Sequence, residues 1–309
     1  MRRPRGGRRR CARAADDDSG AGQIPAAVLG LDIGGSTSRA RFRNGSSADV
    51  NAEGPGANVA TLEDRIVDER LAALLHKLGR IQPEACCAGA AGAEVAEGRA
   101  RLESLLHRAL PESRIRVVHD ARLVLAAAGL DSGIALIAGT GSVAYGRARD
   151  GREAQRGGWG WMIGDEGSAV WITREAARVV MARAEANAPI GRLGEAMLNA
   201  TGTDEARAMV RELHSRREPM RWAELASTVF ETAARDEGAR EIVVRGGAAL
   251  ARLVDSLDMD GPVVLAGGLL LHQPALENGV RDALGRECVR LEHPPVEGAV
   301  RLAEEMLRA

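Results

Sequence analysis

Three short stretches combine glycine with hydroxyl side chains, or pair two glycines, directly after an apolar run. Residues 34–37 read Gly-Gly-Ser-Thr, residues 139–142 read Gly-Thr-Gly-Ser, and residues 267–268 are both glycine. A glycine turn after a strand lets backbone N–H groups approach phosphate oxygens without a Cβ in the way. One such turn alone favours an ordinary hairpin over a phosphate site. Three turns at strand ends favour a nucleotide held between two domains.

Carboxylates occupy the positions next to these turns. Asp32 lies between Leu31 and Ile33 at the end of an apolar run, where a buried charge needs a partner such as a metal ion. Asp120 follows a predicted strand over 114–118, and strand ends of α/β sheets face the ligand crevice. The alternatives are that Asp32 is a turn residue and that Asp120 only caps the following helix.

Lysine and aromatic usage are both unusual. Lys77 is the only lysine, which excludes mechanisms that need a lysine in a Walker A loop or on a kinase strand. The chain has few aromatic side chains, yet Trp159, Trp161 and Trp171 fall close together, with Tyr145 shortly before them. This clustering predicts an aromatic wall of a binding site. A locally well-packed core is the alternative.

Composition indicates a globular protein of one or two domains. The 309 residues are 45% apolar and 28% charged. The net charge of −1 predicts no general attraction to nucleic acid or to an anionic membrane, and no apolar run is long enough for a membrane span. The four cysteines lack metal-ligand spacing, which favours reduced thiols in a cytoplasmic protein.

Apolar runs of strand length alternate with segments of helical periodicity, which predicts an α/β protein. We expect a small N-terminal domain over 24–129 that recruits residues 291–309, and a larger domain over 130–290. Residues 28–36 and 135–142 repeat a pattern of strand, glycine turn and hydroxyl. Two similar halves would face each other across a cleft.

The first 23 residues differ from the rest of the chain. They contain seven arginines and a run of three aspartates but no periodic apolar residues, which predicts a disordered tail. No apolar segment follows the arginines, so a signal peptide is not expected. An RNA-binding arm, or a start codon assigned too far upstream, is the alternative.

Four segments carry a specific family resemblance. Residues 31–37 and 137–142 resemble the two phosphate motifs of the superfamily of sugar kinases, heat-shock chaperones and actin, and residues 264–268 resemble its adenosine motif. Residues 157–168, Gly-Gly-Trp-Gly-Trp-Met-Ile-Gly-Asp-Glu-Gly-Ser, closely resemble the signature of N-acetylglucosamine kinases and bacterial glucosamine kinases. These kinases belong to the BadF/BadG/BcrA/BcrD type of ATPase. The resemblance spans about 27–309.

The resemblance implies a two-domain actin-like (ribonuclease H-like) α/β fold with an interdomain cleft. It implies an ATP- and Mg²⁺-dependent enzyme, often a homodimer, that phosphorylates the 6-hydroxyl of N-acetylglucosamine. Asp120 would be the catalytic base and Asp32 would orient the metal. ATP would be bound by the glycine turns, namely Gly34, Gly35, Ser36, Thr37, Thr140, Gly141, Ser142, Gly267 and Gly268. The sugar would be held by Asn58, Asp120, Gly158, Trp159 and Asp165.

Some positions depart from the family pattern. Ile33 and Ser36 replace a common glycine and threonine, and His119 precedes the proposed base where relatives often carry threonine or asparagine. The alternative for Asp165 is a solvated loop residue.

Glucosamine and N-acetylmuramate are competing candidates for the substrate. A non-catalytic sugar sensor and an iron–sulfur ATPase activator of a dehydratase or reductase are competing functions, although cysteines do not follow the glycine turns.

Overall fold

The computed structural model describes residues 27–45, 47–93 and 95–308, and it contains two five-stranded sheets. The predicted tail over 1–23 lies outside these residues. The first sheet has the order β3-β2-β1-β4-β5 and the second the order β10-β9-β6-β7-β8. Their strands are β1 (Val28–Ile33), β2 (Thr37–Arg43), β3 (Val50–Pro55), β4 (Ala85–Ala90), β5 (Arg114–His119), β6 (Gly133–Ala138), β7 (Ser142–Arg147), β8 (Glu153–Gly157), β9 (Val263–Ala266) and β10 (Cys288–Arg290).

The two sheets share one topology. In each, the first three strands form an antiparallel meander, and the last two add in parallel on the other side of the first strand. Strands β1 and β6 therefore hold equivalent central places, and the glycine turns at 34–37 and 139–142 follow them. The weak sequence repeat is the trace of this repeated topology, and the predicted α/β fold is confirmed.

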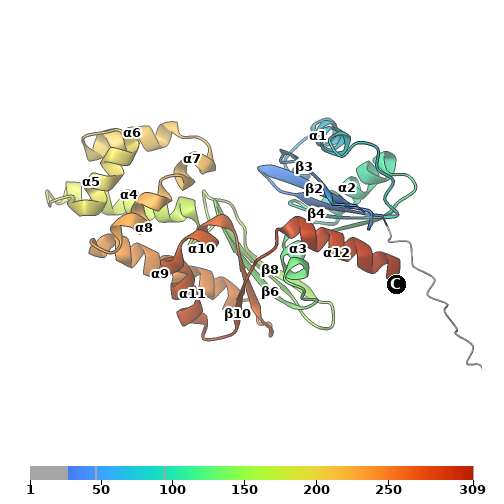
Figure 1. Cartoon of the computed structure of the whole chain (residues 1–309). Coiled ribbons are helices and arrows are strands. Elements are labelled where there is room, and N and C mark those ends of the chain that lie inside the picture. The colour runs from blue at the N-terminus through green and yellow to red at the C-terminus, as the bar shows by residue number, and fades with distance from the viewer. Residues whose placement is uncertain (1–26, 46, 94, 309) are drawn as a thin grey trace, which may run out of the picture.

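Helices cover both faces of the first sheet (Figure 1). Alternate residues of β1 serve the two faces: Leu29 and Leu31 pack with α1 and α2, and Val28 packs with α12 on the opposite face. The helices of this lobe are α1 (Asp64–His76), α2 (Ala96–Ala109), α3 (Asp120–Ala127) and α12 (Pro295–Arg308).

The C-terminal helix α12 crosses back from the second lobe to pack on β1, β4 and α3 (Figure 1). Gly298 permits this approach, because a Cβ at that position would lie 2.1 Å from the carbonyl oxygen of Leu123. Polar contacts add to the packing: Glu297 accepts hydrogen bonds from Arg41 at 2.6 Å and from Arg43 at 3.0 Å. The domain boundaries near 129 and 290 stay a prediction.

We expect Glu297→Gln to loosen this attachment and to lower the free energy of unfolding by about 2 kcal/mol, as for a hydrogen bond to a charged group. Burial alone would raise the pKa of Glu297, but the hydrogen bonds from Arg41 and Arg43 outweigh it and lower the pKa. The stabilisation is therefore complete above the unfolded pKa and disappears as the pH falls through the lower folded pKa. Urea unfolding should show a clear difference from the unchanged protein at pH 7 and a small one near pH 3.

Helices of the second lobe form two groups. The long helix α9 packs on α11 and the sheet, and a further cluster extends beyond them around α4 (Figure 1). In the described ranges no helix is both long and apolar enough to cross a bilayer. The helices are α4 (Ala169–Glu185), α5 (Gly191–Thr201), α6 (Ala206–Ser215), α7 (Pro219–Ala223), α8 (Ala226–Thr232), α9 (Glu237–Asp255), α10 (Gly268–His272) and α11 (Pro274–Leu284).

Helix α3 lies between the two lobes and packs against both of them. Leu123 packs with α12 and the first sheet, whereas Val124 and Leu125 pack with strands of the second sheet. This sandwiched helix is apolar around most of its circumference, as expected for an element buried on both sides. Its first residue, Asp120, is consequently held at the junction of the two lobes.

Candidate active site

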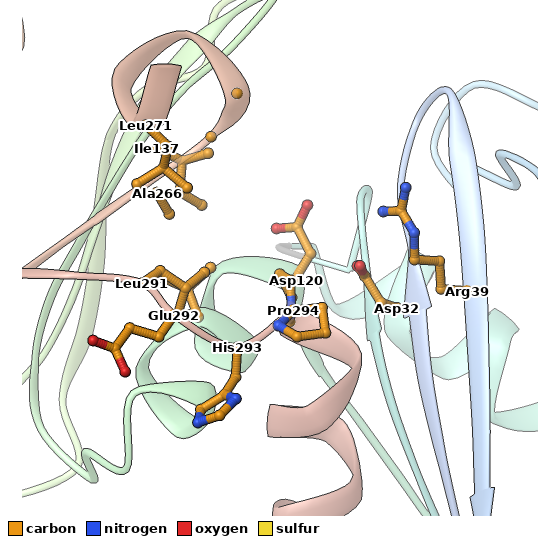
Figure 2. Close-up of a pocket in the computed structure, with 14 residues that line it drawn as sticks. Asp32, Arg39, Asp120, Ile137, Ala266, Leu271, Leu291, Glu292, His293 and Pro294 are labelled. Atoms are coloured by element: carbon orange, nitrogen blue, oxygen red, sulfur yellow. The ribbon is translucent and has the colours of Figure 1, made fainter. Parts of the chain in front are cut away.

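A cavity of about 550 Å³ lies at this junction, a volume in the usual range for small-ligand sites. It is lined by the end of β1, the start of α3, the turn after β9 and the crossing segment 291–295. Figure 2 shows Asp32, Asp120 and Arg39 on one side, with Ile137, Ala266 and Leu271 across from them. Of the residues singled out from the sequence, the cavity brings together Asp32, Asp120, Gly267 and Gly268.

Asp32 is the most strongly perturbed carboxylate of the cavity. Burial and then the nearby charge of Asp120 raise its pKa to about 6, while the charge of Arg39 opposes the shift. A carboxylate that is shielded from solvent beside a second carboxylate forms a site that a divalent cation would stabilise. Within the described residues no group of three or more His, Cys, Asp or Glu side chains gathers. The site fits Mg²⁺, which takes few protein ligands and completes its shell with water and phosphate.

Asp120 begins α3, and its Oδ1 accepts the backbone N–H of Ala121 at 2.7 Å. His119 holds the N-cap position, and its Nδ1 accepts the same N–H at 3.0 Å. Helix capping alone therefore does not require the Asp120 carboxylate. The side chain of Asp120 is 35% exposed, which leaves it accessible to a ligand in the cavity.

Arg39 is a cavity residue that the sequence analysis missed. It lies on β2 directly opposite Asp32 in the antiparallel register, and its Nε is 3.3 Å from a carboxylate oxygen of Glu53. The Arg39 guanidinium adds positive charge beside the Asp32 carboxylate. The predicted hairpin could have identified Arg39, because a short turn at 34–37 brings β2 back so that Arg39 pairs with Asp32.

The first glycine turn lies beside the cavity rather than in its lining. It is closed by a hydrogen bond from the Gly34 N–H to the Thr37 carbonyl at 3.0 Å, and Gly35 and Ser36 are exposed. The loop that carries Asn58 packs on this turn, since the Ala57 N–H donates to the Gly34 carbonyl at 3.2 Å. The structure therefore joins Asn58 to the first turn but does not place it in the cavity.

The second and third turns meet each other. Gly267 has φ +92°, and a Cβ there would lie 2.3 Å from the Ala138 carbonyl oxygen, so only glycine fits. A Cβ on Gly139 would lie 3.9 Å from the Gly268 nitrogen. Ser142 is buried, and its hydroxyl donates to the Glu166 carbonyl at 2.8 Å. That hydroxyl is thus already used within the protein.

Thr140 and Gly141 of the second turn face other neighbours. The Thr140 hydroxyl lies 3.8 Å from the sulfur of Met220 on α7. Gly141 packs against Asp165, because a Cβ on it would lie 2.5 Å from Asp165 Oδ2. The resemblance-based sugar residue Asp165 therefore sits directly over a turn expected to bind phosphate.

Asp165 is buried rather than solvated. Its backbone is in the left-handed region at φ +58°, which is uncommon for a residue with a side chain. Burial raises its pKa, and the backbone N–H groups of Gly160 and Ser142 oppose the rise. Within the described chain Oδ1 has no hydrogen-bond partner. A buried acceptor in this state is costly and suits a ligand hydroxyl.

The three tryptophans do not form the predicted wall. Trp171 is buried in the helical cluster, and Trp161 lies 6.2 Å from Trp222 between ring centroids. Trp159 is 76% exposed on the loop after β8, next to the exposed Gly158. The clustering in sequence was misleading because the loop and the following helix point these side chains in different directions. Of the three, Trp159 is the one that is exposed, and its sugar-binding role stays a prediction.

Two sheets of one topology on either side of a carboxylate-lined cavity are the architecture of the actin-like fold. The chain belongs to the BadF/BadG/BcrA/BcrD ATPase family, whose model matches residues 29–303. Its fold is similar to that of a provisionally named N-acetylglucosamine kinase from Chromobacterium violaceum, with a TM-score of 0.73 and 24% identity over 91% of this chain and 100% of that one. A similarly named protein from Porphyromonas gingivalis gives a TM-score of 0.72 and 22% identity over 90% of this chain and 99% of that one.

Curated relatives are sugar kinases by name. An N-acetylmuramic acid/N-acetylglucosamine kinase from Clostridium acetobutylicum is 37% identical over 166 residues, which are 50% of this chain and 53% of that protein. An N-acetyl-D-glucosamine kinase from Dictyostelium discoideum is 26% identical over 196 residues, which are 59% of this chain and 61% of that protein. The matches thus span only a little over half the length of these relatives.

Proposed function

We propose that this protein is an ATP-dependent amino-sugar kinase that transfers the γ-phosphoryl group to the 6-hydroxyl of N-acetylglucosamine. The observation that carries the proposal is that Asp32, Asp120 and Arg39 line one cavity with the Gly267–Gly268 turn. Phosphoryl transfer needs positioning, a group that takes the acceptor's proton, and positive charge around the phosphates. The cavity offers a residue for each need.

Asp120 is the proposed general base. Its carboxylate accepts the proton of the sugar hydroxyl as the oxygen bonds to phosphorus and ADP leaves. Asp32 would hold Mg²⁺, and the bound ion would neutralise phosphate charge. Arg39 adds a fixed positive charge from the β2 side. The sole lysine cannot fill this role where it lies, since Lys77 Nζ donates to the Glu53 carbonyl at 2.7 Å on the surface.

The contacts to the sugar and the phosphates come from residues around the cavity. Asn58 on the first lobe, and Gly158, Trp159 and Asp165 on the second, are the proposed sugar contacts, but none of them lines the cavity. We infer that the two lobes approach each other when both ligands bind, which brings the first and second glycine turns onto one nucleotide. Closure of this kind excludes water that would otherwise hydrolyse ATP.

N-acetylmuramate is the second candidate substrate, because the Clostridium acetobutylicum relative is named for both sugars. The two sugars share an acetamido group and the free 6-hydroxyl, and they differ at the 3-position. Glucosamine would use the same hydroxyl contacts. We also propose that the protein is cytoplasmic and that it works as a homodimer.

A coupled ADP-release assay tests the proposal. ATP and Mg²⁺ are supplied with N-acetylglucosamine, N-acetylmuramate, glucosamine, N-acetylmannosamine, glucose or no sugar. We expect ADP release that depends on an amino sugar and is fastest with N-acetylglucosamine. ADP release at one rate with and without every sugar would contradict a sugar kinase.

Gly35→Ala should weaken ATP binding without changing the stability of the fold. A Cβ at Gly35 would meet nothing within 4 Å, so we expect an unchanged melting temperature. The added methyl group would stand where phosphate oxygens approach the backbone, and the KM for ATP should rise about tenfold, equivalent to 1.4 kcal/mol. The matched variant is Gly267→Ala, where strain at φ +92° and the Ala138 contact should lower stability as well. Equal melting temperatures for both variants would contradict this account.

Trp159→Ala should weaken sugar binding and leave ATP binding unchanged. Because the side chain is 76% exposed, its removal should not alter the melting temperature. We expect the KM for the sugar to rise about tenfold, since the loss of an aromatic contact of about 1.4 kcal/mol has that effect. Steady-state kinetics with each substrate varied in turn measure both constants. An equal rise in the two KM values would count against a sugar-binding role.

A further inference from the structure

His119 connects the two lobes directly beside Asp120. It is the last residue of β5, and its buried ring stacks on Tyr145 of β7 with centroids 5.0 Å apart and an interplanar angle of 20°. Its Nε2 lies 2.6 Å from Oε1 of Gln155 on β8. One side chain of the first lobe thus contacts two strands of the second sheet.

The hydrogen bonds of His119 define where its ring proton lies. Nδ1 accepts the backbone N–H of Ala121 and therefore carries no proton in the neutral ring. Gln155 donates its amide N–H to the Gly157 carbonyl at 3.4 Å, which turns Oε1 toward His119 as an acceptor. A proton on Nε2 satisfies both contacts, and this is the tautomer that we assign.

The His119 ring also lies against the proposed base. Nδ1 of His119 is 3.0 Å from Oδ1 of Asp120. Both atoms accept the backbone N–H of Ala121. This shared donor holds the His119 ring against the Asp120 carboxylate.

The other end of the connection reaches the loop proposed to bind the sugar. Gln155 contacts the Gly157 carbonyl, and a Cβ on Gly158 would lie 3.0 Å from Gln155 Nε2. Trp159 follows immediately. An unbroken series of contacts therefore runs from Asp120 through His119 and Gln155 to the loop 157–159.

We propose that His119 is a positioning residue that ties Asp120 to the loop 157–159 through Gln155, so that the base and the sugar loop keep one fixed separation. This inference rests on the proposed kinase activity. A displacement of about 1 Å at a reacting group can lower turnover about 100-fold. Losing the connection should therefore lower kcat and leave ATP binding unaffected.

Three variants and a control test the proposal with the full chain. His119→Asn keeps an oxygen that can cap α3 but cannot reach Gln155, and Gln155→Leu removes the same connection from its other end. We expect each to lower kcat about tenfold with the KM for ATP changed less than twofold. The double variant should be no slower than the slower single variant, because both remove one interaction. Gln82→Leu, on an exposed edge of the first lobe, is the control and should keep the wild-type kcat.

Additive losses, or wild-type kcat in both single variants, would overturn the inference while the kinase assignment stands. Nitrogen-15 NMR of the ligand-free protein gives a second readout. We expect a slowly exchanging Nε2 proton that disappears in His119→Asn and becomes exposed to exchange in Gln155→Leu. An Nδ1-protonated ring, or an Nε2 proton unaffected by Gln155→Leu, would also overturn it. If the wild-type protein shows no sugar-dependent turnover, the kinase proposal fails, and this signal decides the His119–Gln155 contact separately.

Discussion

Asp120→Asn should lower kcat about 1000-fold and leave the KM values for ATP and sugar within a few-fold of the wild-type values. A general base contributes about 100- to 10,000-fold to a rate, and the amide of asparagine cannot accept the proton of the sugar hydroxyl. The substitution keeps the shape of the side chain, and its oxygen can still accept the Ala121 N–H. Steady-state kinetics with both substrates measure the three constants.

The control for this variant is the melting temperature, which should stay close to that of the wild-type protein. Asn is a good residue at the start of a helix, and the neighbouring His119 still caps α3. A turnover number near the wild-type value would show that another group takes the proton, and it would remove Asp120 from its proposed role. A large loss in ATP affinity with normal kcat would instead place the carboxylate on the nucleotide.

Asp32→Asn should have the second-largest effect and should combine lost activity with increased stability. We expect kcat/KM for ATP to fall about 100-fold and the Mg²⁺ concentration for half-maximal rate to rise at least tenfold, in line with the loss of a group that orients a metal. The wild-type carboxylate has its pKa raised to about 6 by burial and by the charge of Asp120. Keeping it ionised at pH 7 therefore costs the ligand-free protein stability.

The sign of the pH dependence follows from that raised pKa. The folded protein binds a proton at Asp32 more readily than the unfolded chain, so this group disfavours the folded state above about pH 6 and ceases to do so as the pH falls below the unfolded value. Asp32→Asn should accordingly raise the melting temperature at pH 7 without Mg²⁺ and have little effect near pH 4. The Mg²⁺ requirement of the wild-type enzyme should increase as the pH falls below 6. An Asp32→Asn protein with unchanged Mg²⁺ dependence would exclude Asp32 from the metal site.

The repeated fold could be predicted from the sequence because local sequence patterns mark its hairpins. Glycine turns after apolar strands at residues 34–37 and 139–142 mark the first hairpin of each lobe, and the two hairpins hold equivalent positions in sheets of one topology. Asp32 and Asp120 could be selected because each stands at a strand end, where side chains of α/β proteins face the crevice. The cavity contains both of them.

Other features depend on register and packing that the sequence does not display. Arg39 enters the cavity because β2 pairs residue by residue with β1, which sets it opposite Asp32. The hydrogen-bond partner of Ser142 could not be predicted either. Its hydroxyl lies in the second turn, but it donates to the Glu166 carbonyl rather than remaining available to a phosphate. Trp171 turned inward with α4 while Trp159 stayed on the surface. Spacing along the chain could not separate these cases.

Phosphorus–proton correlation NMR of the reaction products tests the central claim most directly. The full-length protein is incubated with ATP, Mg²⁺ and N-acetylglucosamine, and Asp120→Asn is run in parallel. We predict a new phosphomonoester signal coupled to the two protons on carbon 6 of the sugar, formed in step with ADP and almost absent with the variant. Inorganic phosphate as the only new phosphorus product besides ADP, or a phosphate coupled to another sugar carbon, would contradict the account.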